Sequence, residues 1–432
     1  MMENLMMIYL SKMKKYFLIA VLFFSINSLA QSNCDTIKLP VVFVHGFLAS
    51  GDNWSTQIQR FIKSGYCEDR LFVFDWNTIG EEKSDSLLEV LIKRVLKQTH
   101  AEKVNLVAHS AGGGLCFPFL KDSLRSKLVS NYVHIGSIPI AGAAGPHAEI
   151  PTMNIYSPDD KVVKGYAIDG TTNVMERGFD HLQVASSGLT FESIYKFFNN
   201  DQNPVLINTI QNQNTKSLIS GRVISLGENQ PMSRDTILLF EFNAQSGERI
   251  SKKPQVIITD KNGNWPSTLV DKSAALEFEL HSKSSRTIRY FVEPQLSDNH
   301  LIYLRTIPAT GIAGGLLRAI PKNDTAVALA IFSASHAIIN GRDSLTIDGI
   351  NLSTPLLTPT KKTIVANFVF DDGDGKSSNA NIKGFGIGMF LSAVDTYIKA
   401  SKKEKSVIYF NGKTLLLPRV ASSKAVLVAM FN

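Results

Sequence analysis

Short apolar runs alternate with an amphipathic pattern between residues 38 and 200. Each run is nearly all apolar, as in strands that are covered on both faces of a parallel sheet. The expected strands are Val41–Val44, Leu71–Phe74, Val104–Val107, Tyr132–Ile135 and Met153–Tyr156. Within Ser84–Thr99, apolar residues recur at i, i+3 and i+4 spacing, which predicts an amphipathic helix between the second and third strands. This alternation predicts an α/β domain with a mostly parallel sheet.

The pattern changes after about residue 203, where Asn, Ser, Thr and Lys become frequent and helical periodicity fades. Short strand-like runs separated by turn signals such as Asp260–Gly263 take over, as in a β-sandwich or a small barrel. The first of these runs are Gly221–Ile224, Thr236–Phe242, Gln255–Thr259 and Leu276–Leu280. From about Leu301 a further β-rich stretch runs to the end, interrupted by Ile387–Ala400, where apolar residues form one helical stripe.

Length and composition agree with this division. A chain of 432 residues with 44% hydrophobic and 19% charged residues is long enough for at least two globular domains. We expect an α/β domain over residues 31–203 and a β-rich domain, a sandwich or a barrel, over residues 204–432. The second domain could consist of two modules, 204–300 and 301–432.

The N-terminus differs from the rest of the chain. Three lysines precede the apolar run Tyr16–Ile26, which is too short to span a bilayer comfortably. Ser28 and Ala30 place small residues at the two positions that a signal peptidase inspects. We therefore expect residues 1–30 to be a signal peptide, cleaved after Ala30, and the mature protein to be secreted. An uncleaved membrane anchor is the alternative.

The charge balance argues against one class of partner. The formal net charge is +7, and removing the first thirty residues, which hold three lysines and one glutamate, leaves +5. Spread over so long a chain, this excess makes no concentrated basic patch, so we expect no nucleic-acid partner.

The chain has three cysteines, Cys34, Cys67 and Cys116. Cys34 and Cys67 each precede a strand-like run by a few residues and are the better candidates for a disulfide in an oxidising compartment. Cys116 follows a glycine cluster on an expected buried helix, where a free cysteine behaves as a small hydrophobic residue. Three free thiols remain the alternative, because a sequence does not establish connectivity.

The segment Val104–Gly114 carries the first sign of catalytic chemistry, because an expected strand leads directly into a glycine-rich helix start with Ser110 at the junction. So tight a turn requires small residues two positions before and two positions after the serine. Ala108 and Gly112 occupy these positions. The common form has glycine at both, and alanine satisfies the same steric requirement. Ser110 is therefore the expected nucleophile.

A serine nucleophile needs a general base, and the base needs a carboxylate that fixes its tautomer. Asp160 lies in the loop after the fifth expected strand, at the edge where α/β sheets place their active sites. His181 follows 21 residues later, just before the expected last helix, Phe191–Phe198. We expect Asp160 and His181 to complete the triad. Asp159 is expected to cap the turn and Asp180 to be a loop carboxylate, because a side chain rarely turns back onto the ring of its neighbour.

A tetrahedral oxyanion requires two donors that already point at it. The first candidate is the backbone N–H of Ala111, at the start of the helix after the nucleophile, where the helix dipole adds favourable potential. The second is the N–H of Phe47 in the loop after the first strand, where Gly46 lets the backbone turn inward. This chemistry uses side chains and backbone alone, so we expect no cofactor and no metal.

Four motifs resemble a known family in their order and spacing. The segments H-G-F, A-H-S-A-G, S-P-D-D-K-V-V and F-D-H-L are similar to those of compact secreted bacterial lipases of the α/β-hydrolase superfamily. The resemblance covers residues 40–200 and favours Asp160 as the acid, because the x-V-V that follows it ends this loop in related hydrolases. It implies an α/β-hydrolase fold and hydrolysis of carboxylic esters.

Residues 205–432 more loosely resemble the C-terminal β domain of an archaeal long-chain lipase. This resemblance implies lipid-sized substrates, such as acylglycerols, and contact with a lipid surface through the β-rich domain. No candidate for the triad or the oxyanion hole lies beyond His181. We therefore expect the β-rich domain to decide the substrate class, and a chain ending near Asn203 to keep the catalytic machinery.

Two other functions stay open. One is a secreted surface-binding protein whose hydrolase domain is secondary or inactive, although the intact triad spacing argues against it. The other is a polyester or feruloyl esterase, which shares the chemistry and differs in the shape of the pocket.

Several other polar residues have a simpler structural interpretation. His45 and His109 flank the expected site and are more consistent with packed residues than with a second base. His147 is expected in a surface loop. The acidic turn Asp371–Gly375 suggests calcium, but it lacks the bidentate glutamate that completes an EF-hand loop, so a solvated β-turn is favoured.

Overall fold

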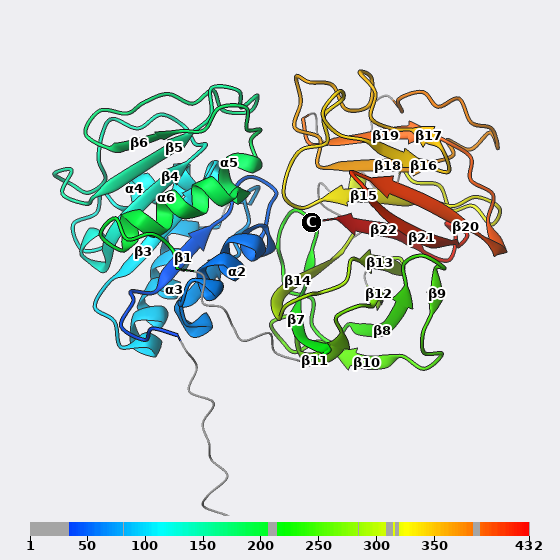
Figure 1. The fold of residues 1–432 in the computed structure, drawn as a ribbon, viewed down its shortest axis with the longest axis horizontal. Helices are drawn as coiled ribbons and strands as arrows, with labels where there is room; N and C mark the ends of the chain where they lie inside the picture. The colour runs from blue at the N-terminus through cyan, green and yellow to red at the C-terminus, as the bar shows by residue number, and fades with distance from the viewer. Residues whose placement is uncertain are drawn as a thin grey trace, which may run out of the picture.

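Two halves of different architecture lie side by side in the computed structural model (Figure 1). The first is an α/β structure and the second is built almost entirely of strands. The structure describes residues 34–80, 82–205, 214–283, 285–307, 314–315, 319–382 and 389–431. The expected signal peptide, residues 1–30, lies outside the described residues.

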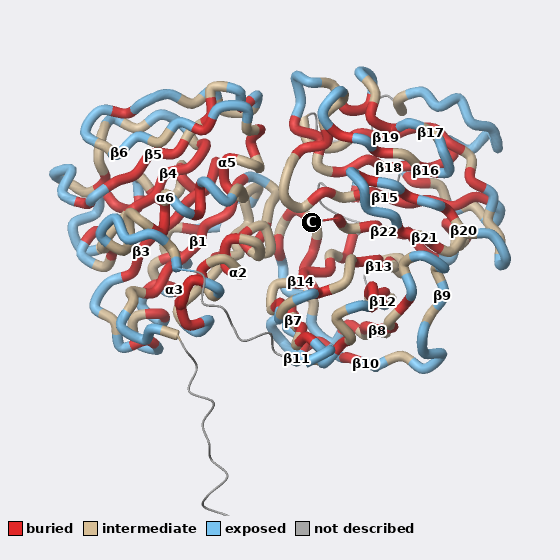
Figure 2. Tube along the Cα trace, viewed as in Figure 1, coloured by how far each residue is buried: buried red, intermediate tan, exposed pale blue. Residues whose placement is uncertain are grey.

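A six-stranded sheet forms the centre of the first half, and all of its strand pairs are parallel. In spatial order its strands are β2 (Leu71–Phe74), β1 (Val41–Val44), β3 (Val104–His109), β4 (Val129–Ile135), β5 (Thr152–Tyr156) and β6 (Thr172–Met175). Every residue of β1 and β3 is buried (Figure 2), as their apolar runs predict. The expected parallel α/β sheet is confirmed. Strand β6 was not predicted from the sequence, because it is an edge strand whose side chains are mostly exposed.

Helices cover both faces of this sheet. They are η1 (Gly51–Trp54), α2 (Ser55–Lys63), η2 (Glu68–Arg70), α3 (Ser84–Thr99), α4 (Ala111–Phe119), η3 (Ser126–Leu128), α5 (Gln183–Ser186) and α6 (Gly188–Phe198). On one face, Ile92 of α3 and Cys116 of α4 share a core with Val42. On the other, Ile194 of α6 shares a core with Phe43. Neighbouring residues of β1 thus enter opposite cores, as the two-residue period of a strand requires.

The second half is organised around a nine-stranded sheet. Its main path runs through β10 (Gln255–Ile258), β8 (Thr236–Asn243), β12 (Ala275–His281), β13 (Ile288–Val292), β22 (Val426–Phe431), β15 (Leu329–Ser333), β18 (Ala366–Phe370) and β19 (Leu391–Asp395), with β9 (Glu248–Arg249) paired to β8. The last strand of the chain, β22, lies between β13 and β15 and is parallel to both. One continuous sheet therefore joins strands from before and after residue 300.

Two smaller sheets cover the two faces of the nine-stranded sheet. One consists of β11 (Asn264–Asp271), β7 (Lys216–Ser225) and β14 (Asn299–Thr306), and the other of β17 (Ile350–Asn351), β16 (Leu345–Ile347), β20 (Ser401–Phe410) and β21 (Lys413–Arg419). Leu304 of β14 shares a core with Ala330 of β15, whereas Phe410 of β20 shares a different core with Leu329 of β15. The second half is therefore a layered β structure, which confirms its predicted β-rich class.

One predicted element is wrong. The apolar stripe in Ile387–Ala400 predicted a helix, but Leu391–Asp395 forms strand β19, paired in parallel with β18. Ala393 and Val394 enter two different cores, one on each face of the sheet. Because both faces are covered, apolar residues occur without the alternation of a half-exposed strand, and their spacing of three and four residues imitates a helix. Ile387 itself lies outside the described residues.

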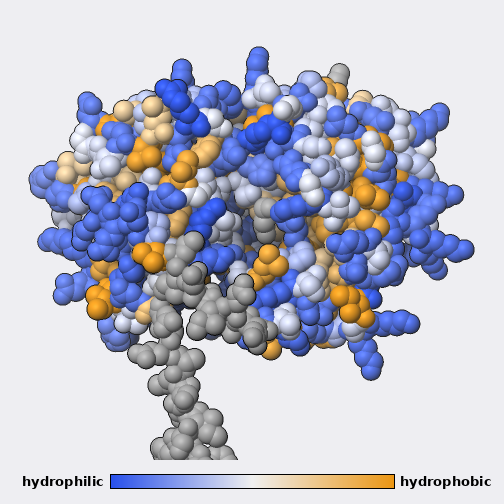
Figure 3. Space-filling model, in the orientation of Figure 1, coloured by the Kyte–Doolittle hydropathy of each residue, from blue (hydrophilic) through white to orange (hydrophobic). Residues whose placement is uncertain are grey.

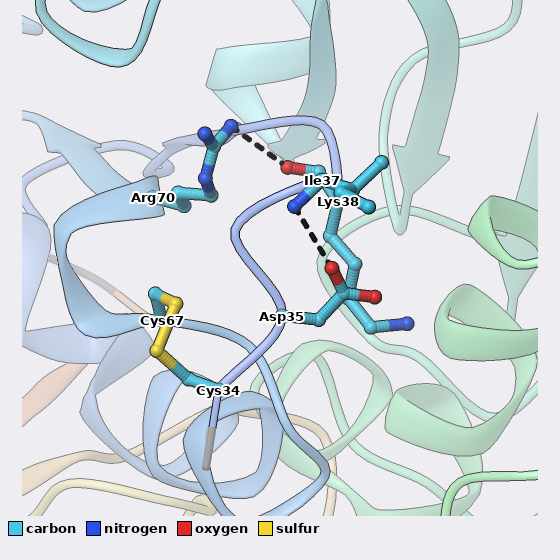
Figure 4. Close-up of a disulfide and its surroundings, with 6 residues drawn as sticks. All are labelled: Cys34, Asp35, Ile37, Lys38, Cys67 and Arg70. Carbon is cyan, nitrogen blue, oxygen red and sulfur yellow. Dashed lines mark hydrogen bonds between the residues drawn. A yellow bond between two sulfur atoms is a disulfide. The ribbon is translucent and has the colours of Figure 1, made fainter. Parts of the chain in front are cut away.

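A disulfide joins Cys34 to Cys67 (Figure 4), as the spacing of these two cysteines before apolar runs suggested. It ties the first described residue to the segment that precedes β2. Arg70 adds a second tie, because its Nη1 donates a hydrogen bond of 3.0 Å to the carbonyl oxygen of Lys38. Cys116 is a buried free cysteine, also as expected.

On the face drawn in Figure 3, hydrophilic residues predominate and apolar residues are scattered. Within the described part of the chain, we find no helix with the length and apolar character needed to cross a membrane.

Candidate active site

Ser110 occupies the sharp turn between β3 and α4. Its backbone has φ 53° and ψ −123°, a conformation that residues other than glycine rarely adopt. The turn brings the start of α4 against the end of β1. A Cβ on Gly112 would lie 2.7 Å from the carbonyl oxygens of both Val44 and His45. Only glycine fits there, which is the steric requirement that the sequence motif predicts.

The structure brings the three expected triad residues together. His181 Nε2 lies 2.9 Å from Ser110 Oγ, and His181 Nδ1 lies 2.6 Å from Asp160 Oδ2. The other oxygen of Asp160 accepts hydrogen bonds from the N–H groups of Val162 and Val163, at 2.7 and 3.1 Å. All three members are buried. With Nδ1 protonated toward the carboxylate, Nε2 is free to accept the serine proton.

The two neighbouring acids have other partners. Asp159 Oδ2 accepts a hydrogen bond of 2.7 Å from the N–H of Gly178, so this carboxylate ties together the two loops that hold Asp160 and His181. Asp180 Oδ1 accepts from the N–H groups of Leu182 and Gln183, at 2.9 and 3.0 Å. Both are loop carboxylates, and neither contacts the ring of His181 through a described hydrogen bond.

Two backbone N–H groups border Ser110 without an internal partner. Among the described residues, no hydrogen bond uses the N–H of Phe47 or of Ala111. The loop after β1 is held in place by the next residue, since the N–H of Leu48 donates to Thr78 Oγ1 at 2.9 Å. Phe47 and Ser110 line the same cavity. These are the two donors that the sequence analysis expected for an oxyanion hole.

Glycine is needed at position 46 because the backbone there passes close to the side chain of Ser110. A Cβ at this position would lie 2.9 Å from the Cβ of Ser110 and 3.3 Å from Nδ1 of His109. Its backbone does not have a positive φ, so the requirement for glycine comes from space beside the serine and not from an unusual conformation.

Two buried histidines, His45 and His109, pack beside the site and are neutral. His109 Nε2 donates to the carbonyl oxygen of His181 at 2.8 Å, and the two rings lie 4.6 Å apart. Burial and the nearby His181 hold the pKa of His109 well below its usual range. Burial likewise lowers the pKa of His45, whose Nε2 accepts from the N–H of Trp76 at 3.2 Å. Their packed role agrees with the expectation, and His147 is exposed in its loop.

A cavity of about 190 Å³ opens beside Ser110 and His181. The loop after β1 lines one side of it, and the nine-stranded sheet of the second half lines the other. The principal sheet residues are Ala330, Phe332, Ala366, Phe368, Val428 and Met430. The sheet side of the cavity wall is therefore mainly apolar, and most of its residues lie more than 200 positions away from the nucleophile in sequence.

Strand register explains why these side chains make one continuous wall. Phe332 of β15 lies opposite Met430 of β22 on one side and opposite Ala366 of β18 on the other. Leu391 of β19 lies opposite Ala366 and extends the same row. Alternate residues of each strand point to the same face, so the partners in this row all face the cavity. Sequence patterns do not reveal this pairing, because it depends on strands that are distant in the chain.

Ion pairs and hydrogen bonds join the two halves around the cavity. Arg305 of β14 pairs with Asp52 of η1 at 2.7 Å and also donates to Ser50 Oγ at 2.5 Å. Asn229, which has φ 56°, donates to the carbonyl oxygens of Ala49 and Trp76 at 2.7 and 2.9 Å. Residues of the second half thus hold the loop that carries the Phe47 N–H. No local sequence pattern identifies these contacts in advance.

Acidic residues that could hold a metal lie away from this site. In the described part of the chain, one group of His, Cys, Asp or Glu side chains is close enough, namely Asp371, Asp372 and Asp395. Asp371 and Asp372 belong to the loop after β18, and Asp395 is the last residue of β19.

Comparison with known proteins agrees with the fold and with the motifs. The family model described as Lipase (class 2) matches residues 38–117, and the one described as Lipase C-terminal domain matches residues 215–308. A further C-terminal-domain model matches residues 320–423. The first of these includes the loop after β1 and the nucleophile turn.

Several solved structures match part of this chain at low sequence identity. A hydrolase from Thermoplasma acidophilum is 15% identical, with a TM-score of 0.31, over 40% of this chain and 89% of its own. A lipase from Bacillus licheniformis and an esterase from a Rhodococcus species are each 14% identical with a TM-score of 0.31. They match 38% and 39% of this chain, and 94% of their own chains.

The parallel sheet with helices on both faces, the turn at its centre and the two lipase family models point to one conclusion. The chain is a lipase-like α/β-hydrolase, a carboxylic ester hydrolase.

Proposed function

We propose that this protein is a secreted serine lipase that cleaves acylglycerols or similar long-chain esters through an acyl-enzyme on Ser110. The observation that carries the proposal is the chain of contacts from Ser110 Oγ to His181 Nε2 and from His181 Nδ1 to Asp160 Oδ2. This is the arrangement that activates a serine hydroxyl for attack on an ester.

The proposed reaction has two halves. Ser110 Oγ attacks the carbonyl carbon of the ester while its proton moves to His181 Nε2, and the N–H groups of Phe47 and Ala111 stabilise the oxyanion. The bond to the alcohol then breaks, and the departing oxygen takes the proton from His181. Water next attacks the acyl-enzyme with His181 as base, which releases the carboxylic acid and restores the serine hydroxyl.

The apolar cavity wall supports long acyl chains as substrates. Met430, Phe332 and Ala366 form a row across three strands beside the nucleophile. Burial of each methylene group of an acyl chain against such a wall is worth about 0.8 kcal/mol. Every methylene that reaches the wall would thus raise the specificity constant by roughly fourfold. The wall would then set a preference for chain length while the triad supplies the chemistry.

Two observations support secretion. The disulfide between Cys34 and Cys67 is of the kind that persists in oxidising compartments outside the cytosol. It lies directly after the segment that the sequence analysis interprets as a signal peptide.

A chain-length profile tests the proposal. Initial rates are measured on nitrophenyl esters from butyrate to palmitate and on emulsified triacylglycerols, with Ser110→Ala as the blank. We expect hydrolysis throughout and a specificity constant that rises with chain length. Activity confined to short or aromatic esters would favour the esterase alternative. No hydrolysis of any ester by a folded protein would favour the surface-binding alternative and overturn the proposal.

A further inference from the structure

The carboxyl ends of β18 and β19 meet at the same edge of the nine-stranded sheet. The two strands are parallel, and Phe370 at the end of β18 lies opposite Asp395 at the end of β19. Asp371 and Asp372 directly follow β18. This register brings Asp395 close to Asp371 and Asp372, which lie more than twenty residues earlier in the sequence.

These three carboxylates form a tight cluster. Asp371, Asp372 and Asp395 each offer one oxygen, and the three oxygens lie within 4.8 Å of one another. Asp371 and Asp395 are buried, with exposed fractions of 2% and 5%, whereas Asp372 is exposed. Among the described residues, no lysine, arginine or histidine forms an ion pair with any of them. The cluster thus gathers like charges at a buried position without a described counter-charge.

One buried oxygen of the cluster has no partner. Asp371 Oδ1 accepts from the N–H of Gly375 at 2.9 Å, but Asp371 Oδ2 is buried and has no hydrogen-bond partner in the described part of the chain. Asp395, by contrast, is well bonded, since Oδ1 accepts from the N–H of Asp372 and Oδ2 from the N–H and Oγ of Ser378. A buried carboxylate oxygen without a donor is rare in folded proteins and points to a missing cationic ligand.

We propose that Asp371, Asp372 and Asp395 bind a calcium ion. Ca²⁺ takes six to eight oxygen ligands at about 2.3–2.6 Å in flexible geometry, so two of its ligands can lie up to about 4.8 Å apart. Magnesium demands near-ideal octahedral geometry at about 2.0–2.1 Å and is harder to accommodate on two carboxylates that the strands hold in place. Backbone carbonyls of the 371–378 loop and water would complete the shell.

The sequence alone favoured a solvated turn here because Asp371–Gly375 lacks the glutamate of an EF-hand loop. The structure supplies the missing carboxylate from Asp395, which comes from the neighbouring strand and does not belong to the local motif. The site also has a structural consequence, because β19 is the last strand of the sheet and Leu391 of β19 lines the cavity. A bound ion would fasten this edge strand to β18.

The test uses the full-length protein after treatment with EDTA and dialysis. Calcium and magnesium chloride are titrated separately by isothermal calorimetry, and the unfolding temperature is recorded with and without each ion. We expect one Ca²⁺ per chain, an unfolding temperature several degrees higher with Ca²⁺, and an affinity for Mg²⁺ at least tenfold weaker. Absence of saturable Ca²⁺ binding, or equal affinity for both ions, would overturn the proposal.

Three variants assign the ligands. Asp372→Asn changes an exposed ligand and should weaken Ca²⁺ binding at least tenfold while the fold is kept. Asp371→Asn should abolish the calcium response, yet without calcium it should be at least as stable as the parent protein, because it removes a buried charge. Asp374→Asn is the matched control, since Asp374 lies in the same loop outside the cluster. If Asp374→Asn weakens binding as much as Asp372→Asn, general loop charge and not this site binds the ion.

Discussion

Arg342 of the β-rich half donates a hydrogen bond of 2.8 Å from Nη1 to Asp180 Oδ2, directly beside the proposed catalytic base His181. The same guanidinium contacts Gln183 at 2.8 Å, and the N–H of Ala337 donates to the same Asp180 oxygen at 3.1 Å. The loop that carries His181 is therefore held from both sides, by its own half and by the second half. This contact links the β structure to the proposed chemistry as well as to the cavity wall.

Loss of Arg342 should loosen this loop. Arg342→Ala leaves the buried carboxylate of Asp180 without its ionic partner, and we expect kcat on butyrate esters to fall by about tenfold, since a small misplacement of the base is costly. The unfolding temperature should also fall. Arg419→Ala is the matched control, because Arg419 pairs with Asp348 and Glu404 in the same half. Equal kcat losses in both variants would show that Arg342 acts through global stability alone.

The choice between the two neighbouring acids is directly testable. Asp160 contacts His181 Nδ1, whereas Asp159 contacts the N–H of Gly178. We expect Asp160→Asn to lower kcat by about 10⁴-fold and Asp159→Asn by less than about tenfold. Steady-state kinetics on a short nitrophenyl ester measures both. The opposite ranking would mean that the acid is assigned to the wrong residue.

The cavity wall predicts a selective loss on long substrates. Phe332 is partly buried and lines the cavity opposite Met430. Phe332→Ala should remove contact with about two methylene groups of a long acyl chain, a loss of roughly 1.5 kcal/mol or about tenfold in kcat/KM. Butyrate esters should change by less than about threefold, because they do not reach the wall. Val407→Ala, on an exposed position of β20, is the control for the substitution itself.

An unchanged ratio of kcat/KM between palmitate and butyrate esters would show that the sheet does not bind the acyl chain. Point variants test this better than truncation near Asn203. Removing the second half would also strip Asp52 and Asp180 of their arginine partners, so loss of activity in a truncated chain would not isolate the wall.

Protonation of a buried histidine should limit stability in acid. Burial lowers the pKa of His134 to about 4, and its ring bonds the hydroxyl of Tyr132 and the carbonyl of Ile138, each at 2.8 Å. In the unfolded chain the pKa is near 6.5, so the unfolded state takes up the proton first as the pH falls. The stability that His134 contributes is complete above about pH 6.5 and is lost as the pH falls toward 4, roughly 3 kcal/mol in total.

Urea unfolding between pH 7.5 and pH 4.5 measures this dependence. The His134→Gln variant should lose less stability over this range than the parent protein does, by roughly 2–3 kcal/mol. His147→Gln, at an exposed loop position, should follow the parent curve. Parallel curves for His134→Gln and the parent would rule out His134 as a source of the acid sensitivity.

Much of the first half could be predicted because its signals are local. The bounds of β1, β2 and α3 agree with the expected Val41–Val44, Leu71–Phe74 and Ser84–Thr99. Runs buried on both faces and one amphipathic period identify these elements. The triad residues could also be predicted from local signals. The tight turn at Ser110 and the loops after two strands fix where these side chains can point.

The features that could not be predicted depend on pairing between strands that are distant in the sequence. The row formed by Phe332, Met430 and Ala366 follows from register across β15, β22 and β18, which no local pattern encodes. The same cause hid the meeting of Asp395 with Asp371 and produced the wrong helix over Ile387–Ala400. When both faces of a strand are covered, its sequence loses the alternation that would identify it.

Nucleophilic attack by Ser110 is the central claim of this account, and one variant tests it most directly. Ser110→Ala removes the hydroxyl and leaves the turn intact, so circular dichroism should be unchanged while kcat on a butyrate ester falls by about 10⁶-fold. Intact-mass spectrometry after exposure to a nitrophenyl phosphonate ester should show one covalent adduct on the parent protein and none on the variant. A folded Ser110→Ala protein that keeps its activity, or still forms the adduct, would contradict the account.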